Sequence, residues 1–136
     1  YQSQLAKVDV RVRIPNDLPN IIGEEQRLQQ VLGNLISNAL DAMKETQDPQ
    51  LMIAVTPTTD NVEVVVSDNG CGVPSDQLDT MFEPFQTSKK IGEGLGLGLS
   101  ITANNMRDMQ GKVSAQLNAD KGMSFTLMFE LAPHRS

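Results

Sequence analysis

The sequence predicts an α+β fold, a two-layer α/β sandwich in which a mixed, mostly antiparallel sheet carries helices packed on one face. Three observations predict it. The 136 residues have the length of one domain, 39% of them are apolar, and the apolar spacing alternates between a period of two and a helical period. These periods follow the order strand, helix, strand, strand, helix, strand, strand. We therefore expect a single domain over residues 1–136, with its core at about 5–131 and a tail at 132–136.

The first half of the chain contains the clearest periodic segments. Residues 8–14 alternate apolar and charged side chains, which predicts a half-buried strand closed by Pro15. Residues 24–44 predict an amphipathic helix, because apolar side chains recur at helical spacing. These side chains are Leu28, Val31, Leu32, Leu35, Ala39 and Met43. The β-branched runs 51–55 and 62–66, separated by turn-forming residues, predict an antiparallel hairpin.

The second half alternates turns with shorter periodic segments. Ser75 is a candidate cap for a short helix over 75–80, and residues 86–98, with four glycines and little periodicity, predict a mobile loop. A second long helix should then begin near Leu99 and end at Gly111. Two strands, at about 112–117 and 123–131, complete the sheet.

Composition excludes several classes of partner and site. The 11 basic and 17 acidic side chains give a net charge of −6, which argues against binding to nucleic acid or to an anionic membrane surface. No apolar run has the length of a membrane span, and no signal peptide is visible. We assign no role to the lone Cys71, and His134, in the expected tail, is not a catalytic candidate. Because the chain begins with Tyr1 rather than Met, we expect it to be a piece of a larger protein.

A first candidate site lies on the predicted helix 24–44. Helical geometry places Asn34, Asn38 and Asp41 on one polar stripe beside the apolar face. Asparagine is a modest helix former, so two of them four residues apart need a reason. An amide oxygen can join the coordination of Mg²⁺ beside phosphate oxygens. Solvated polar residues with local pairing are an equally good explanation of this stripe alone.

A second candidate site is the segment 67–72, directly after a strand of valines. Gly70 and Gly72 allow the backbone to approach a flat ligand, and the Asp68 carboxylate can accept a hydrogen bond from an exocyclic amine. A keto group would leave that carboxylate unpaired, so adenine could be told from guanine here. Taken alone, this pattern is more often only a tight turn.

A third candidate site is the glycine-rich segment 92–99, which precedes the second long helix. Its bare N–H groups and the helix dipole suit phosphate oxygens, although a flexible hinge would also explain the glycines. The sequence has neither the Gly-Lys-Ser/Thr of a P-loop nor a strand immediately before these glycines. Between this segment and the second site, two phenylalanines within 81–90 can anchor a lid, or simply join the core, and Lys89 or Lys90 can reach phosphate or remain solvated.

In this order, the four segments resemble the motifs of sensor histidine kinases. Residues 34–39 resemble the N box, 68–72 the G1 box, 82–85 the F box and 94–98 the G2 box. The resemblance extends over about residues 5–131 and implies the catalytic ATP-binding domain, with its Bergerat-type α/β sandwich. The residues within these motifs are similar to those of nitrogen-regulatory and dicarboxylate-transport sensor kinases.

The resemblance also implies a role for individual residues. Asn38 would hold Mg²⁺ on the triphosphate of ATP, with Asn34 beside it as the second catalytic residue, and Asp68 would bind the adenine amino group. A lid would run from about residue 85 to 96. The full set of implied nucleotide contacts is Asn38, Asp41, Asp68, Gly70, Gly72, Phe85, Thr87, Lys89, Gly94, Leu95, Gly96, Leu97 and Gly98.

The resemblance favours a kinase over other proteins of the same fold. Relatives that hydrolyse ATP, and serine kinases of the anti-sigma type, carry Glu where Asn34 stands, and water needs such a base more than a neutral imidazole does. A module that binds ATP without catalysis is the alternative from another class. The implied partners are a helical dimerisation and phosphotransfer domain of the same parent, which would carry the acceptor histidine, and a response regulator. The implied place is the cytoplasmic side of a parent anchored in the bacterial inner membrane, without direct membrane contact by this domain.

Overall fold

The structure, a computed structural model, describes residues 8–16, 23, 25–72, 78 and 95–131. Five strands and two helices occupy these residues, and all the elements have the predicted type and order. They are β1 (Asp9–Arg13), α2 (Glu25–Ala42), β2 (Gln50–Pro57), β3 (Asn61–Asp68), α3 (Leu95–Asp108), β4 (Lys112–Leu117) and β5 (Met123–Glu130). None of the described helices is both long enough and apolar enough to cross a membrane.

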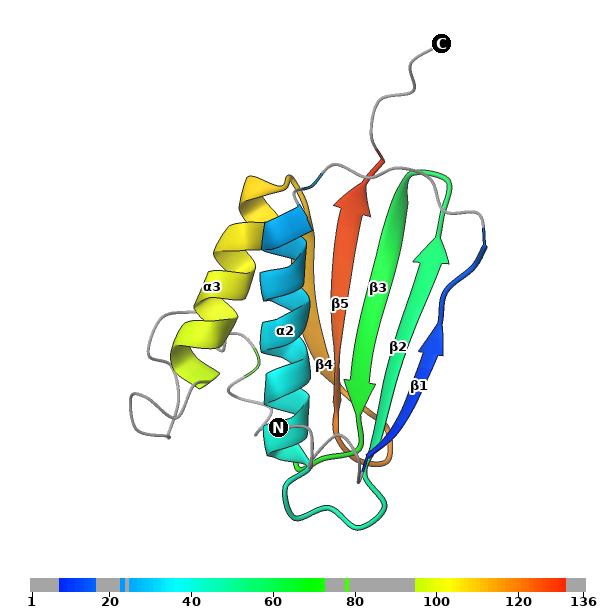
Figure 1. Ribbon diagram of the computed structural model, residues 1–136, viewed down its shortest axis with the longest axis vertical. Coiled ribbons are helices and arrows are strands. Elements are labelled where there is room, and N and C mark those ends of the chain that lie inside the picture. Colours follow the sequence, from blue (N-terminus) through cyan, green and yellow to red (C-terminus); the bar gives the residue numbers. More distant parts are fainter. Residues whose placement is uncertain (1–7, 17–22, 24, 73–77, 79–94, 132–136) are drawn as a thin grey trace.

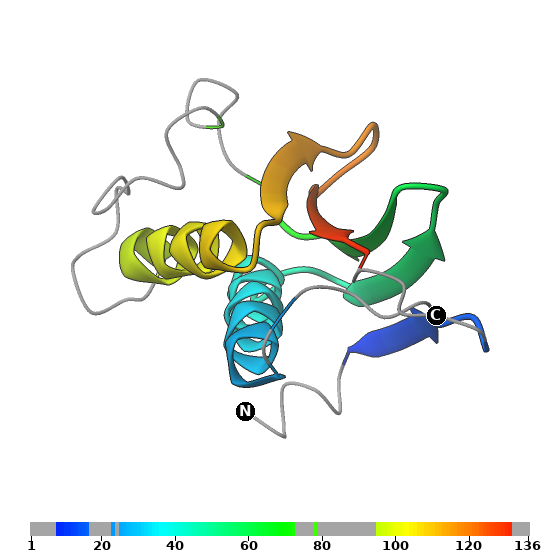
Figure 2. The ribbon, with the colours of Figure 1, turned by 90° about the horizontal axis from the view of Figure 1, so that it is seen from above.

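The strands form one sheet in the order β1-β2-β3-β5-β4. Only β1 and β2 pair in parallel, and the other three pairs are antiparallel. Both helices cover the same face of this sheet, as the view from above shows (Figure 2). The prediction of a two-layer sandwich with a mixed, mostly antiparallel sheet is therefore confirmed.

The core lies between the two layers. The helix α2 contributes its predicted apolar stripe, with Val31 and Leu35 fully buried, and β3 and β5 contribute alternate residues such as Val66 and Phe129. Alternate side chains of a strand point to opposite faces, so Asp68, two residues after Val66, belongs to the same helix-facing row. The end of β3 therefore directs a carboxyl group toward the helices.

The two helices are also joined by a polar cluster. The Nη1 atom of Arg27 on α2 donates to Asn105 and to Asp108 of α3, both at 2.9 Å, and Asn105 donates to Gln30 at 2.9 Å. Asn105 is buried, so its hydrogen bonds compensate for lost hydration. This cluster fixes the packing of α3 against the N-terminal end of α2.

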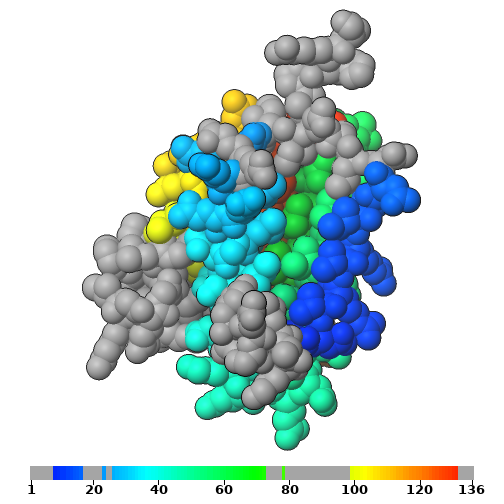
Figure 3. Space-filling view, in the orientation of Figure 1, coloured from blue at the N-terminus to red at the C-terminus, as the bar shows by residue number. Residues whose placement is uncertain are grey.

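The prediction of a half-buried first strand is wrong. All five residues of β1 are exposed, and Val10 and Val12 are 42% and 52% exposed. The strand lies at the outer edge of the sheet, on the side away from the helices (Figures 1 and 3). Alternation in the sequence shows which side chains share a face, but it does not show whether another layer covers that face.

The start of the second long helix also differs from the prediction. The helix α3 begins at Leu95, so the last four residues of the predicted loop 86–98 are helical. Glycine weakens a helix by about 1 kcal/mol relative to alanine, which is why the glycines at 96 and 98 favour a loop when the sequence is read alone. The rest of that loop and the predicted helix over 75–80, apart from Leu78, lie outside the described residues.

The end of α3 uses a different residue from the one predicted. Gln110, not Gly111, has the left-handed conformation, with φ 61°. Gln110 N donates to Arg107 O at 3.0 Å and Gly111 N to Met106 O at 2.7 Å, which is the pattern of a Schellman cap. Gly111 is required for a different reason, because a Cβ there would lie 2.5 Å from Met128 O.

Candidate active site

The buried carboxyl group of Asp68 is the most distinctive polar feature of the helix-facing side of the sheet. The residue is 5% exposed, and its Oδ1 accepts a hydrogen bond from Gly70 N at 2.8 Å. Burial raises the pKa of Asp68, while the backbone N–H groups of Gly70 and Met123 lower it in part. A carboxylate kept in place at this cost is suited to accept a further hydrogen bond from a ligand.

The chain after Asp68 runs against the end of α2. Cys71 N donates to Ala42 O at 3.1 Å, and a Cβ on Gly70 would lie 2.5 Å from that same oxygen. Gly72 has φ 68°, a conformation that side chains rarely adopt. Gly70 thus allows close packing of the loop on the helix. Its contact with a nucleotide base stays a prediction, as does that of Gly72.

The three polar residues predicted on α2 share one half-buried stripe. Asn34, Asn38 and Asp41 all have intermediate exposure. The Nδ2 atom of Asn38 is buried and has no hydrogen-bond partner among the described residues. Since a buried amide group without a partner costs stability, the arrangement fits a side chain that completes its bonding only when a ligand is present. An amide rotation exchanges Nδ2 and Oδ1, so the same position can present an acceptor oxygen.

Elements far apart in the sequence bring these motifs to one end of the molecule. The C-terminal ends of β3 and α2 and the N-terminal end of α3 all lie at the lower end in Figure 1. Residues 95–98 of the glycine motif form the first turn of α3, whose free N–H groups and dipole attract anions. The described parts of the motifs predicted for base, metal and phosphate therefore share this end, while Phe85, Thr87, Lys89 and Gly94 lie outside the described residues.

A magnesium ion would find few protein ligands here. No group of three or more His, Cys, Asp or Glu side chains forms a metal cluster within the part of the chain that the structure describes. The donor that fits is the Asn38 amide, a neutral hard oxygen suited to an ion that takes its other ligands from phosphate and water. The residues present therefore fit an ion carried by a nucleotide better than an ion bound by protein alone.

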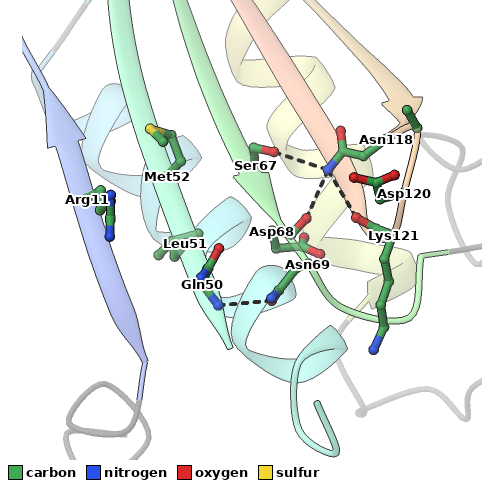
Figure 4. Close-up of a pocket in the computed structure, with 11 residues that line it drawn as sticks. Arg11, Gln50, Leu51, Met52, Ser67, Asp68, Asn69, Asn118, Asp120 and Lys121 are labelled. Atoms are coloured by element: carbon green, nitrogen blue, oxygen red, sulfur yellow. Dashed lines mark hydrogen bonds between the residues drawn. The ribbon is translucent and has the colours of Figure 1, made fainter. Parts of the chain in front are cut away.

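Two surface hollows lie near the end of β3, and Asp68 is among the residues that line the larger one. The larger, of about 480 Å³, is on the face of the sheet opposite the helices, where Arg11, Met52 and Ser67 point (Figure 4). The smaller, of about 240 Å³, lies beside the end of α2 and is lined in part by Asp41, Ala42 and Cys71. Asp68 therefore borders a hollow on the open face and also belongs to the buried, helix-facing row of β3.

Sequence reasoning missed the residues that support Asp68 from the β4–β5 turn. Asn118 Nδ2 donates to the Asp68 carbonyl oxygen at 2.9 Å, and Gly122, with φ 89°, packs against the same peptide group. Asn69 likewise joins strands, because its Oδ1 accepts from Gln50 N at 2.9 Å. The sequence indicates only a turn at residues 120–122, and these contacts require the pairing of β5 with β3, which the sequence does not specify.

Comparison with known families agrees with this geometry. The family described as "Histidine kinase-, DNA gyrase B-, and HSP90-like ATPase" matches residues 23–133. The chain is 32% identical over 123 residues to the C4-dicarboxylate transport sensor protein DctB of Rhizobium meliloti, which covers 90% of this chain and 19% of that protein. It is 35% identical over 119 residues to the sensor protein FixL of Bradyrhizobium diazoefficiens. This match covers 87% of this chain and 23% of FixL. The chain therefore spans less than a quarter of the length of these two relatives.

Solved structures show the same architecture. The catalytic domain of the histidine kinase ThkA superimposes with a TM-score of 0.81 at 27% identity, covering 97% of this chain and 86% of that domain. The full-length ShkA in complex with AMPPNP gives a TM-score of 0.77 at 25% identity, covering 98% of this chain and 27% of that protein. The predicted fold and the predicted resemblance are both confirmed.

Proposed function

Since this chain belongs to the family of histidine kinase-, DNA gyrase B- and HSP90-like ATPases, we propose that it is the ATP-binding catalytic domain of a sensor histidine kinase. It binds Mg-ATP and donates the γ-phosphoryl group to a histidine on a helical dimerisation and phosphotransfer domain of its parent. The observation that carries the proposal is the buried Asp68 carboxyl group at the end of β3, on the face shared with the helices. Similarity to DctB and FixL, both named sensor proteins, supports the signalling role.

The Asp68 carboxylate accounts for the choice of base. The carboxylate accepts hydrogen bonds from the backbone N–H groups of Gly70 and Met123, and because its two oxygens offer about four lone pairs, it can still accept one from the exocyclic amine of adenine. A guanine would present a keto oxygen at that place, and two facing acceptors would leave a buried charge unpaired. The Gly72 backbone would line the base beside this carboxylate.

The residues on α2 account for the choice of phosphoryl transfer over hydrolysis. Asn34 is an amide and has no basic group with which to deprotonate water. A neutral imidazole already offers a lone pair, so attack by histidine needs no such base. Asn38 would hold the ion that neutralises the phosphates, and the first turn of α3 would contribute N–H groups to the phosphate side.

The partners and the place of action follow from the same proposal. The parent protein carries the acceptor histidine on its helical domain and passes the phosphoryl group to a response regulator. The parent is anchored in the bacterial inner membrane and holds this domain on the cytoplasmic side. The domain itself touches neither nucleic acid nor membrane, in keeping with its net charge of −6.

The base specificity of the 136-residue chain tests the proposal. We expect micromolar binding of Mg-ATP in calorimetry, at least about tenfold weaker binding of Mg-GTP, and severe loss of ATP binding in Asp68→Ala. Glu45→Ala, which removes an exposed carboxylate from the loop after α2, is the matched control and should bind like the unaltered chain. Equal affinity for the two nucleotides would refute the role of Asp68.

The transfer reaction separates a kinase from a module that only binds ATP. The chain is mixed with the helical domain of its parent and with ATP labelled at the γ-phosphate. Label on a histidine of that domain is the expected result. Binding of ATP without any transfer would favour the non-catalytic alternative, and release of phosphate without transfer would favour an ATPase.

A further inference from the structure

A small hydrogen-bonded ring of side chains lies on the face of the sheet opposite the helices, directly behind Asp68. Its members are Ser67 at the end of β3, Asn118 after β4 and Ser124 in β5 (Figure 4 labels Ser67 and Asn118). Ser67 and Ser124 are direct partners in the β3–β5 register. Ser124 is 7% exposed, whereas Ser67 and Asn118 are half-buried and line the larger hollow, so the ring is partly shielded from water.

The positions of the protons in this ring follow from its chemistry. Asn118 Oδ1 has no proton, so the Ser124 hydroxyl must donate to it across 2.6 Å. A hydroxyl has one proton, and Ser124 Oγ therefore accepts in its 2.9 Å contact with Ser67 Oγ. Ser67 Oγ in turn accepts from Asn118 Nδ2 at 3.2 Å. All three bonds consequently run in one direction around the ring.

This direction leaves one proton of Asn118 for the backbone of Asp68. The second proton on Nδ2 points to the Asp68 carbonyl oxygen at 2.9 Å, with Lys121 O more distant at 3.5 Å. The turn that holds Asn118 is closed by Asn118 N donating to Gly122 O at 3.0 Å. A Cβ on Gly122 would overlap the Asp68 carbonyl oxygen, so the turn and the strand end are in close contact.

We propose that Asn118, Ser67 and Ser124 are positioning residues that fix the peptide of Asp68, and thereby the direction of its carboxylate toward the adenine amine. This inference rests on the proposed function, because it takes Asp68 as the base-reading residue. The ring holds the strand end on the open face of the sheet while the carboxylate acts on the helix face. A shift of this strand end would move the Cα of Asp68 and with it the carboxylate, so the ring should affect the choice of base more than the binding of phosphates.

The test is the ratio of the dissociation constants for Mg-GTP and Mg-ATP, measured by calorimetry on the 136-residue chain. Asn118→Asp keeps the size of the side chain but replaces the donating Nδ2 by an acceptor that faces the Asp68 carbonyl. Ser124→Ala removes the hydroxyl that donates to Asn118. We expect each variant to lower the ratio by about tenfold, mainly through weaker ATP binding.

Two further variants distinguish positioning from general stability. Ser124→Thr retains the hydroxyl and should retain the ratio. Ser114→Ala removes an exposed hydroxyl from the same face of β4, outside the ring, and should behave like the unaltered chain. The midpoint of thermal unfolding is recorded for every variant.

The outcomes separate this inference from the proposed function. A lower ratio in Asn118→Asp and Ser124→Ala, with the ratio retained in Ser124→Thr, supports the positioning role. A lower unfolding temperature with an unchanged ratio overturns it, while leaving the proposed function intact. Equal binding of ATP and GTP by the unaltered chain, or an unaffected ratio in Asp68→Ala, overturns the proposed function and this inference with it.

Discussion

At the scale of single residues, the candidate site is marked by polar groups that the fold buries at a cost. Asp68 is buried with its pKa raised, and Asn38 has a buried Nδ2 without a partner among the described residues. Such residues are expected where stability is given up for a ligand.

The titration of Asp68 gives a pH-dependent prediction. Because the folded-state pKa lies above the ordinary value of 3.8, the folded protein binds the proton more tightly than the unfolded chain does. The penalty for burying the charge is therefore complete above the folded-state pKa and is relieved as the pH falls through it. We expect Asp68→Asn, which has no charge to bury, to exceed the unaltered chain in stability at neutral pH. That difference should shrink as the pH falls toward 3.8.

Denaturant unfolding at a series of pH values measures this difference. The exposed Asp120 provides the control in Asp120→Asn, whose difference in stability from the unaltered chain should stay small across the pH series. A difference for Asp68→Asn that grows as the pH falls would contradict the prediction.

Because the amide of Asn38 has a buried Nδ2 without a partner in the described part of the chain, we expect that its replacement by an apolar side chain raises stability and abolishes function. We expect Asn38→Leu, which replaces the buried amide by an apolar group, to raise the free energy of unfolding by about 1–2 kcal/mol without nucleotide. The same variant should lose phosphotransfer to the helical domain. The neighbouring Ser37 is exposed on α2, and Ser37→Leu should change neither property appreciably. Chemical unfolding and the labelled transfer assay measure the two effects, and a destabilised Asn38→Leu would show that the amide has a structural purpose.

At the scale of elements, glycines of the same helix-and-loop unit have opposite roles. A Cβ added to Gly33 in α2 would meet no atom within 4 Å, whereas a Cβ on Gly70 would lie 2.5 Å from Ala42 O. We expect Gly33→Ala to stabilise the domain by about 1 kcal/mol through helix propensity. Gly70→Ala should destabilise it by about 1–3 kcal/mol, because the loop must move off α2.

Thermal unfolding of the two variants side by side gives the comparison. An equal effect of both substitutions would mean that the loop yields easily. In that case the contact between the end of β3 and the end of α2 would not hold the site together.

The elements differ in how well the sequence predicts them. The sequence predicts helix α2 closely, because the stripe of Val31, Leu35 and Ala39 is long and regular. It does not predict the start of α3, because glycines at helix positions 96 and 98 oppose a helix that tertiary packing stabilises. The predicted cap of α3 is wrong by one residue, because Gln110 adopts the conformation usually left to glycine.

At the scale of the whole molecule, the sequence predicts the two layers but not which strands lie next to each other in the sheet. Alternation and turns predict strands and hairpins, yet the order β1-β2-β3-β5-β4 depends on packing between distant segments. The exposure of β1 and the ring formed by Asn118 follow from that order. The candidate residues Asp68 and Asn38 could be predicted because their chemistry is unusual for their local setting, and the residues that support them could not.

The parallel pairing of β1 has a mechanical consequence for this edge of the sheet. Asp9 N donates to Pro49 O at 2.9 Å, the next residue donates from Gln50 N to Asn69 Oδ1, and Asn69 directly follows Asp68. These hydrogen bonds link β1, through residues 49 and 50, to the residue that follows Asp68. Fraying of β1 would therefore loosen the strand end at Asp68 and Asn69 before it disturbed the buried core of the domain.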